Sequence, residues 1–104
     1  MEKEVLIKHI KDADRNALVS LIDKLKVSHK NSIIVLIGTS KESISIVCSV
    51  NGEAQKAYKA GDLVRSVAQA LGGSGGGRPD FASGAGKDAS KIGEAIEVAK
   101  GLVK

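Results

Sequence analysis

The sequence predicts an α+β fold in which a small mixed β-sheet has helices packed on one face. Short β-branched runs and helical apolar spacings follow one another in the order β-α-β-β-α-(loop or short strand)-α. Hydrophobic residues make up 42% of the chain and charged residues 27%, the balance of a globular protein. A length of 104 residues suits one core, so we expect residues 1–104 to form a single domain.

The first half of the chain predicts a strand, a helix and a hairpin. Residues 4–10 (EVLIKHI) are rich in β-branched side chains and predict the strand. Asp14 is a good N-cap for the helix that follows. The apolar stripe of this helix is Leu18, Leu21, Ile22 and Leu25. The continuous run 32–38 (SIIVLIG) indicates a strand buried on both faces or near the sheet centre, and the alternating run 43–50 (SISIVCSV) completes an antiparallel hairpin.

The second half predicts two helices separated by a glycine-rich loop. Residues 53–62 (EAQKAYKAGD) are compatible with either a loop or a frayed helix. Asp62 can cap a helix that ends at Gly72, and Asp88 can cap the last helix. Between these helices, residues 81–83 (FAS) can form a brief strand. The expected buried stripes are Leu63, Val64, Val67, Ala68 and Leu71 in the first of these helices and Ile92, Ala95, Ile96 and Ala99 in the last.

Composition argues against several classes of function. Tyr58 and Phe81 are the only aromatic residues, so the usual platform for stacking the bases of a single strand is missing. The single cysteine, Cys48, allows no internal disulfide or cysteine-rich zinc site, and we expect it in the core of a cytoplasmic protein. No apolar run approaches the roughly 20 residues of a membrane span, so we expect no membrane partner. We expect no catalytic residue, metal or cofactor in this domain.

Positive charge and glycine coincide in the second half of the chain. The net charge is +4, and residues 54–104 hold eight Lys or Arg against five Asp or Glu. Seven of the chain's 12 glycines lie in the stretch 71–88 (LGGSGGGRPDFASGAGKD). Glycine loses more conformational entropy on folding than any other residue, so this concentration needs a compensating role.

Two interpretations of the glycine-rich stretch are open at this point. In the first, successive backbone N–H groups form an anion nest, and Arg78, Lys87 and the start of the last helix help it to bind a phosphate. In the second, the stretch is a flexible surface loop, which richness in Gly and Ser usually indicates. The spacing does not fit a P-loop, and residues 84–89 (GAGKDA) match the dinucleotide pattern G-x-G-x-x-A without the later acidic residue and the second βαβ half that this site needs.

The stretch GGSGGGRPDFASGAG resembles the signature of the C-terminal globular domain of alanyl-tRNA synthetase, and the elements before it resemble the same domain. A more divergent form of this domain follows the catalytic domain of the DHH phosphoesterases. The resemblance covers essentially the whole chain and implies a C-terminal fragment of a larger ligase, which uses ATP in cytoplasmic protein biosynthesis. It further implies that the fragment is not itself an enzyme but binds tRNA(Ala) at the outer elbow, supporting aminoacylation and editing by other domains.

The resemblance also implies a set of residues for contact with nucleic acid. The signature contributes four glycines and a basic residue before the proline, and the entry to the last helix contributes a further glycine and two lysines. The candidates are Gly73, Gly75, Gly76, Gly77, Arg78, Gly86, Lys87 and Lys91. Two alternatives stay open: a general module for single-stranded DNA or RNA, as in DHH phosphoesterases, and a dimerisation module whose glycines let backbones pack across an interface.

Overall fold

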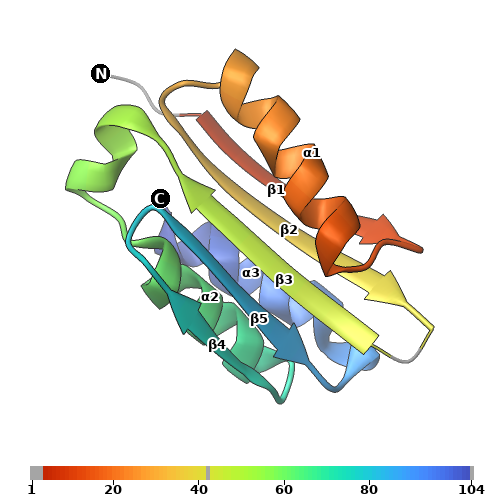
Figure 1. Cartoon of the computed structure of the whole chain (residues 1–104). Coiled ribbons are helices and arrows are strands. Elements are labelled where there is room, and N and C mark those ends of the chain that lie inside the picture. The colour runs from red at the N-terminus through yellow and green to blue at the C-terminus, as the bar shows by residue number, and fades with distance from the viewer. Residues whose placement is uncertain (1–3, 42, 104) are drawn as a thin grey trace.

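A computed structural model describes residues 4–41 and 43–103 of the chain, which form one mixed sheet with helices around it (Figure 1). The strands are β1 (Glu4–Lys11), β2 (Ser32–Ser40), β3 (Ser43–Val50), β4 (Ser74–Gly77) and β5 (Phe81–Gly86). The α-helices of the described ranges are α1 (Arg15–Ser28), α2 (Ala60–Ala70) and α3 (Ile92–Leu102). The strand order is β1-β2-β3-β5-β4, with β1 parallel to β2 and the other neighbours antiparallel. The predicted α+β class with a mixed sheet is confirmed.

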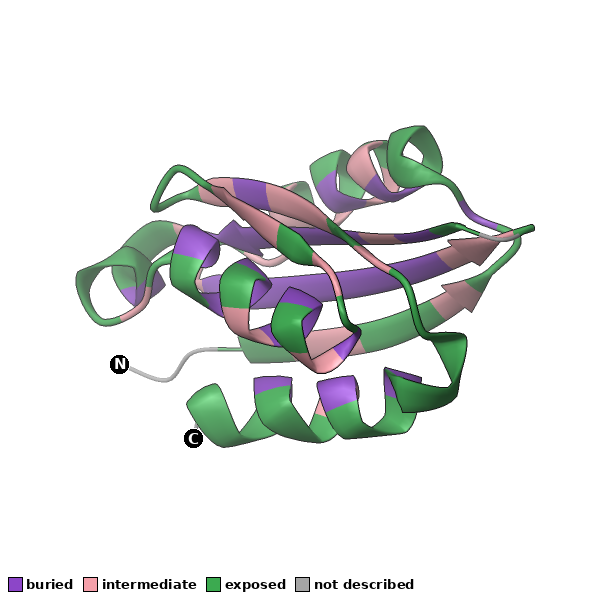
Figure 2. Cartoon of the chain, turned by 90° about the horizontal axis from the view of Figure 1, so that it is seen from below, coloured by how far each residue is buried: buried purple, intermediate pink, exposed green. Residues whose placement is uncertain are grey.

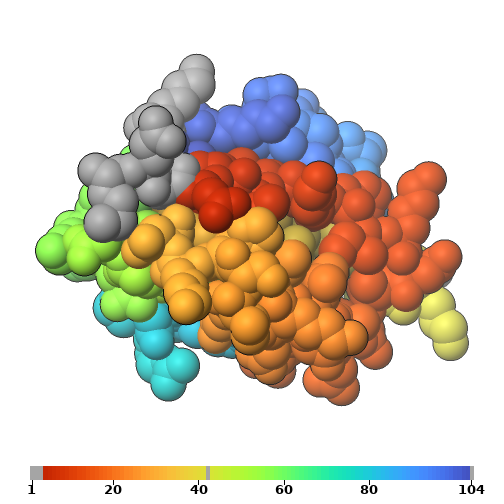
Figure 3. Space-filling model, turned by 90° about the horizontal axis from the view of Figure 1, so that it is seen from above, coloured from red at the N-terminus to blue at the C-terminus, as the bar shows by residue number. Residues whose placement is uncertain are grey.

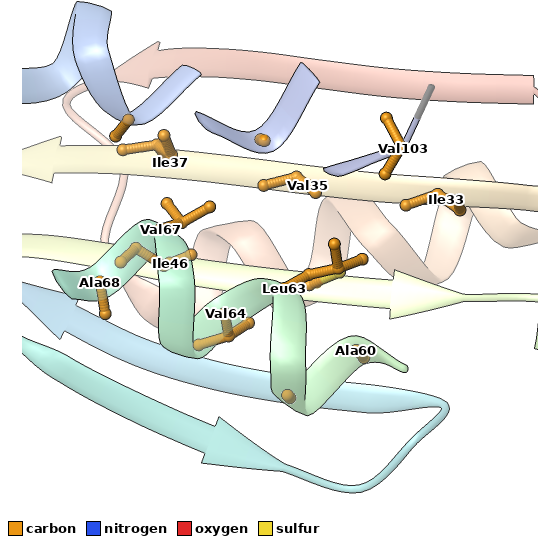
Figure 4. Close-up of a cluster of buried hydrophobic side chains, with 14 of the residues drawn as sticks. Ile33, Val35, Ile37, Ile46, Ala60, Leu63, Val64, Val67, Ala68 and Val103 are labelled. Atoms are coloured by element: carbon orange, nitrogen blue, oxygen red, sulfur yellow. The ribbon is translucent and has the colours of Figure 1, made fainter. Parts of the chain in front are cut away.

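The helices cover both faces of the sheet, not one as predicted (Figure 2). Side chains alternate along β2, so Ile33, Val35 and Ile37 join one core cluster while Ile34 and Leu36 join the other. The first cluster packs against α2 and α3 (Figure 4), and the second packs against α1. Because β2 is apolar on both sides, a single helix layer would have left one apolar face in water.

The predicted cap of α1 is confirmed, but Asp62 does not cap α2, and Asp88 caps the short 3-10 helix before α3 and not α3 itself. The Asp14 carboxylate accepts a hydrogen bond from the Ala17 amide at 2.9 Å, which starts α1 as expected. Helix α2 begins at Ala60 and not after Asp62, and the amide of Ala60 donates to the Pro79 carbonyl at 2.7 Å. Gly72 ends α2 with a φ of +74°, a conformation that glycine adopts without strain.

Short 3-10 helices occupy two of the connections. One spans Gly52–Lys56, within the stretch for which a loop or a frayed helix was predicted. The other spans Ala89–Lys91 and leads directly into α3. Within the described ranges, no helix combines the length and the apolar character needed to cross a membrane.

Candidate nucleic-acid interface

The glycine-rich stretch forms a β-hairpin: the brief strand predicted at residues 81–83 is confirmed as part of β5, whereas the loop predicted before it is wrong at β4. Strand β4 pairs with β5 along its whole length, from Ser74 opposite Ala85 to Gly77 opposite Ala82. The amides that flank the hairpin also have partners inside the chain. Gly73 donates to the Ala68 carbonyl at 2.8 Å, and Lys87 donates to the Leu71 carbonyl at 2.8 Å. These amides do not converge on an empty nest, because main-chain carbonyls already accept their hydrogen bonds.

Most glycines of the hairpin are required because α2 and the two strands approach closely. A Cβ on Gly75 would lie 2.6 Å from the Gly84 Cα and 2.7 Å from a methyl group of Val64 on α2. A Cβ on Gly73 would lie 1.9 Å from the Ala85 carbonyl oxygen, and one on Gly86 would lie 2.6 Å from the Leu71 Cβ. The bare backbone therefore lets α2 pack directly on the hairpin.

Gly76 is the exception among these glycines. A Cβ there would meet nothing within 4 Å, and its φ is not positive. It pairs with Ser83 on the face of the hairpin opposite α2, where Ser74 and Ala85 form the next pair. We call these four residues, Ser74, Gly76, Ser83 and Ala85, the open face, because α1 packs on β2 and β3 and leaves them at least partly exposed (Figure 2).

Sequence reasoning did not identify a cation that lies beside the open face. The Lys26 Nζ of α1 is 5.4 Å from the centre of the Phe81 ring, at the start of β5. Phe81 is half-buried against the α1 cluster, so it is a plug between helix and hairpin with a cation over its ring. No spacing in the sequence links residues 26 and 81, because their contact depends on which face α1 covers.

The structure separates Arg78 and Lys87, the two cations that were expected to bind one phosphate together. Arg78 lies in the turn before β5 and Lys87 lies directly after it. The six residues of β5 hold these ends roughly 20 Å apart at about 3.3 Å per residue. The Arg78 Nε is 3.3 Å from the Asp80 carboxylate, whereas Lys87 has no ion-pair partner among the described residues. One phosphate cannot contact both side chains.

Lys87 and Lys91 do lie together, at the entry to α3. The Asp88 carboxylate between them accepts hydrogen bonds from the Ser90 hydroxyl at 2.6 Å and the Ser90 amide at 3.0 Å, which fixes the turn. The Lys91 Nζ is 3.6 Å from the Glu94 carboxylate one turn further on. These contacts hold the backbone of both lysines while their side chains remain exposed.

Replacing Asp88 with alanine is expected to lower the free energy of unfolding at neutral pH. As the pH is lowered, this free energy should then fall less in the variant than in the unmodified protein. The hydrogen bonds from Ser90, aided by the charge of Lys91, hold the Asp88 pKa below its usual value. The folded chain therefore keeps this carboxylate ionised where the unfolded chain takes up a proton. Its contribution is present above about pH 4 and is lost as pH falls through the lowered pKa. Urea unfolding of both proteins at about pH 6 and pH 3 measures this, and equal losses in acid would contradict it.

Groups for metal binding or nucleophilic catalysis do not come together in the described ranges. No three His, Cys, Asp or Glu side chains of these ranges lie close enough to hold a metal ion. Cys48 is fully buried in the core, and burial raises its pKa to about 12. His9 contacts the Thr39 hydroxyl at 3.2 Å, and His29 contacts the Glu4 carboxylate at 2.6 Å, at separate places in the fold.

The five-stranded mixed sheet, the helices on both faces and the glycine hairpin together define a known class of domain. The chain belongs to the DHHA1 domain family, whose model matches residues 2–104. The crystal structure of the C-Ala domain from Aquifex aeolicus alanyl-tRNA synthetase is similar to it with a TM-score of 0.86 and 27% identity. That match covers 99% of this chain and 98% of the other.

The sequence is also similar to part of several alanine–tRNA ligases. It is 38% identical over 104 residues to the enzyme of Saccharophagus degradans, covering 96% of this chain and 12% of that protein. It is 40% identical over 100 residues to the enzyme of Burkholderia mallei, covering 96% of this chain and 11% of that protein. The resemblance to the alanyl-tRNA synthetase domain is therefore confirmed, and the chain spans only 11 to 12% of the length of these relatives.

Proposed function

We propose that the chain is the tRNA-binding domain of an alanyl-tRNA synthetase and holds tRNA(Ala) at its outer elbow. The proposal rests on the match of the whole chain to the C-Ala domain and to alanine–tRNA ligases. The domain would position the tRNA while other domains of a cytoplasmic ligase carry out ATP-dependent aminoacylation and editing. It would need no cofactor or catalytic group of its own.

The contacts would be made to phosphates and sugars and not to stacked bases. The chain carries a net charge of +4 and only two aromatic residues, so cations dominate what it can offer a nucleic acid. Contacts of this kind hold the backbone without reading sequence. Selection of the tRNA would therefore depend on other domains of the ligase.

The eight candidate residues divide into two groups by their surroundings. The exposed side chains of Arg78, Lys87 and Lys91 would contact phosphates, and Gly76 would let the RNA backbone approach the open face. The other four would act by allowing the close packing that shapes the hairpin. They are Gly73, Gly75, Gly77 and Gly86.

The complex with tRNA is expected to weaken steeply with salt, which fluorescence anisotropy with labelled tRNA measures between about 50 and 200 mM salt. The double variant Arg78→Ala/Lys87→Ala should bind more weakly and reduce the slope of log affinity against log salt by about two. Lys24→Ala/Lys100→Ala removes the same charge from side chains without ion-pair partners in the described ranges, and serves as the control. Absence of binding at low salt, or binding that high salt leaves unchanged, would contradict the proposal.

The same experiment separates the two alternative functions. A short single strand that competes as well as folded tRNA would favour the general single-strand module. Self-association measured by sedimentation, without retention of RNA, would favour the dimerisation module.

A further inference from the structure

Cations from separate segments lie near the same end of the sheet, where β1, β2 and β5 end. The strand register places Lys11, Thr39, Ile44 and Gly86 in one row across β1, β2, β3 and β5. Lys41 follows this row in the β2–β3 turn, and Lys87 follows it after β5. Figure 1 shows the arrowheads of β1, β2 and β5 and the start of α3 at this same end. In Figure 3 the residues that end β1 (red-orange) and those before the β2–β3 turn (yellow) protrude there.

A cleft of about 340 Å³ opens at this end, and we call it the strand-end pocket. One wall is made by the ends of β1 and β2, and the other by the entry to α3 at Ala89 and Ile92. The polar residues that line it are His9, Lys11, Asp12, Thr39 and Lys41. It is therefore built by three segments that are far apart in the sequence, residues 9–12, 39–41 and 89–92.

The lysines of the strand-end pocket have no ion-pair partner among the described residues. In the described ranges, some exposed cations are matched by nearby carboxylates, as in Lys56 with Glu53 at 2.8 Å, while others, such as Lys24 and Lys100, are not. Lys11 and Lys41 form no ion pair within the described residues, although Asp12 lines the same cleft. Neighbouring ammonium groups repel one another, so an anion that lies between them would be favoured.

We infer that the strand-end pocket receives a backbone phosphate of the bound RNA, held by Lys11 and Lys41. This inference rests on the proposed function and adds a second region of contact with RNA. The region lies at the end of β5 that leads into Lys87, and Arg78 lies at the opposite end of that strand. Lysine suits this task because its ammonium acts as a mobile point charge toward a phosphodiester. The His9 Nε2 and the Thr39 hydroxyl share a hydrogen bond at 3.2 Å; with the ring nitrogen as the donor, the Thr39 hydroxyl is free to donate to the same phosphate.

Lys11→Ala/Lys41→Ala is expected to weaken tRNA binding about tenfold at low salt and to reduce the salt slope by about two. Lys24→Ala/Lys100→Ala removes the same charge from the outer side of α1 and the far end of α3, and should change affinity less than about twofold. Asp12→Asn should tighten binding, because it removes the carboxylate that lines the cleft. Asparagine tolerates the positive φ of 58° at this position, so the fold should be unaffected.

The outcomes separate the inference from the function on which it rests. If the unmodified chain binds tRNA but the Lys11→Ala/Lys41→Ala and Lys24→Ala/Lys100→Ala variants have the same affinity, the pocket is not a phosphate site. The proposed function then still stands. If the unmodified chain does not bind tRNA, the proposed function fails and the inference fails with it. Circular dichroism of each variant shows that it is folded, so weaker binding cannot come from unfolding.

Discussion

Replacing Gly75 with alanine is expected to destabilise the domain by about 2 to 3 kcal/mol, the usual cost of overfilling a packed site. The new methyl group would lie 2.6 Å from the Gly84 Cα, which belongs to backbone and cannot rotate away. It would also lie 2.7 Å from the Val64 methyl group, so α2 and the hairpin would have to separate. Val64 is fully buried, and moving it would disturb the cluster between α2 and the sheet (Figure 4).

Gly76→Ala provides the matched control, because residue 76 is the next in β4 and faces the opposite side. A Cβ there meets nothing within 4 Å, so the substitution should be neutral or stabilise by up to about 1 kcal/mol through a less flexible unfolded chain. Urea unfolding of the three proteins measures both effects. Equal stabilities for the two variants would refute the account of close packing given above.

Gly76→Ala then tests the open face without a change in stability. If the RNA backbone approaches Gly76, an added methyl group should weaken tRNA binding while the fold is unchanged. If binding also stays the same, the glycines serve the packing of α2, and the contacts lie with the cations around the hairpin and the strand-end pocket.

The local elements were predictable because they depend on short-range patterns. The stripe through Leu18 and Ile22 predicted α1, and both side chains are fully buried. The run 32–38 indicated a strand buried on both faces, which is what β2 is. The prediction of helices on one face was wrong although this run already pointed to cover on both sides. The direction in which each helix crosses the sheet is set by tertiary packing, which the pattern of one helix does not contain.

The glycine hairpin was missed because its residues have a low preference for strands. Glycine is depleted in strands for reasons of entropy, so four small residues such as Ser74–Gly77 predict a loop. Tertiary context reverses this preference here, since only glycine fits beneath Val64 at positions 75 and 84. The strand-end pocket was missed for another reason: Lys11 and Lys41 line one cleft because Lys11 pairs with Thr39, and this pairing depends on the order and register of the strands.

Cys48 is expected to react with a thiol reagent about a thousandfold more slowly at pH 8 in the folded chain than in the unfolded chain. Only the thiolate reacts, and burial raises the pKa of this thiol from 9.0 to about 12, which lowers the thiolate fraction by about three powers of ten. The side chain is also fully buried within the sheet, with Val35 and Ala82 as its strand neighbours. Labelling followed by mass spectrometry, with and without denaturant, measures the ratio.

The same burial makes stability depend on pH in alkali. Between pH 9 and about 12 the unfolded chain loses the Cys48 proton while the folded chain retains it. The free energy of unfolding should therefore fall by about 1.4 kcal/mol for each pH unit in this window, beyond any other titration. Cys48→Ala lacks this contribution, so the difference in slope between the two proteins isolates it from the lysines and Tyr58. Parallel slopes, or rapid labelling of the native protein, would mean that the sheet opens at β3 often enough to expose its centre to water.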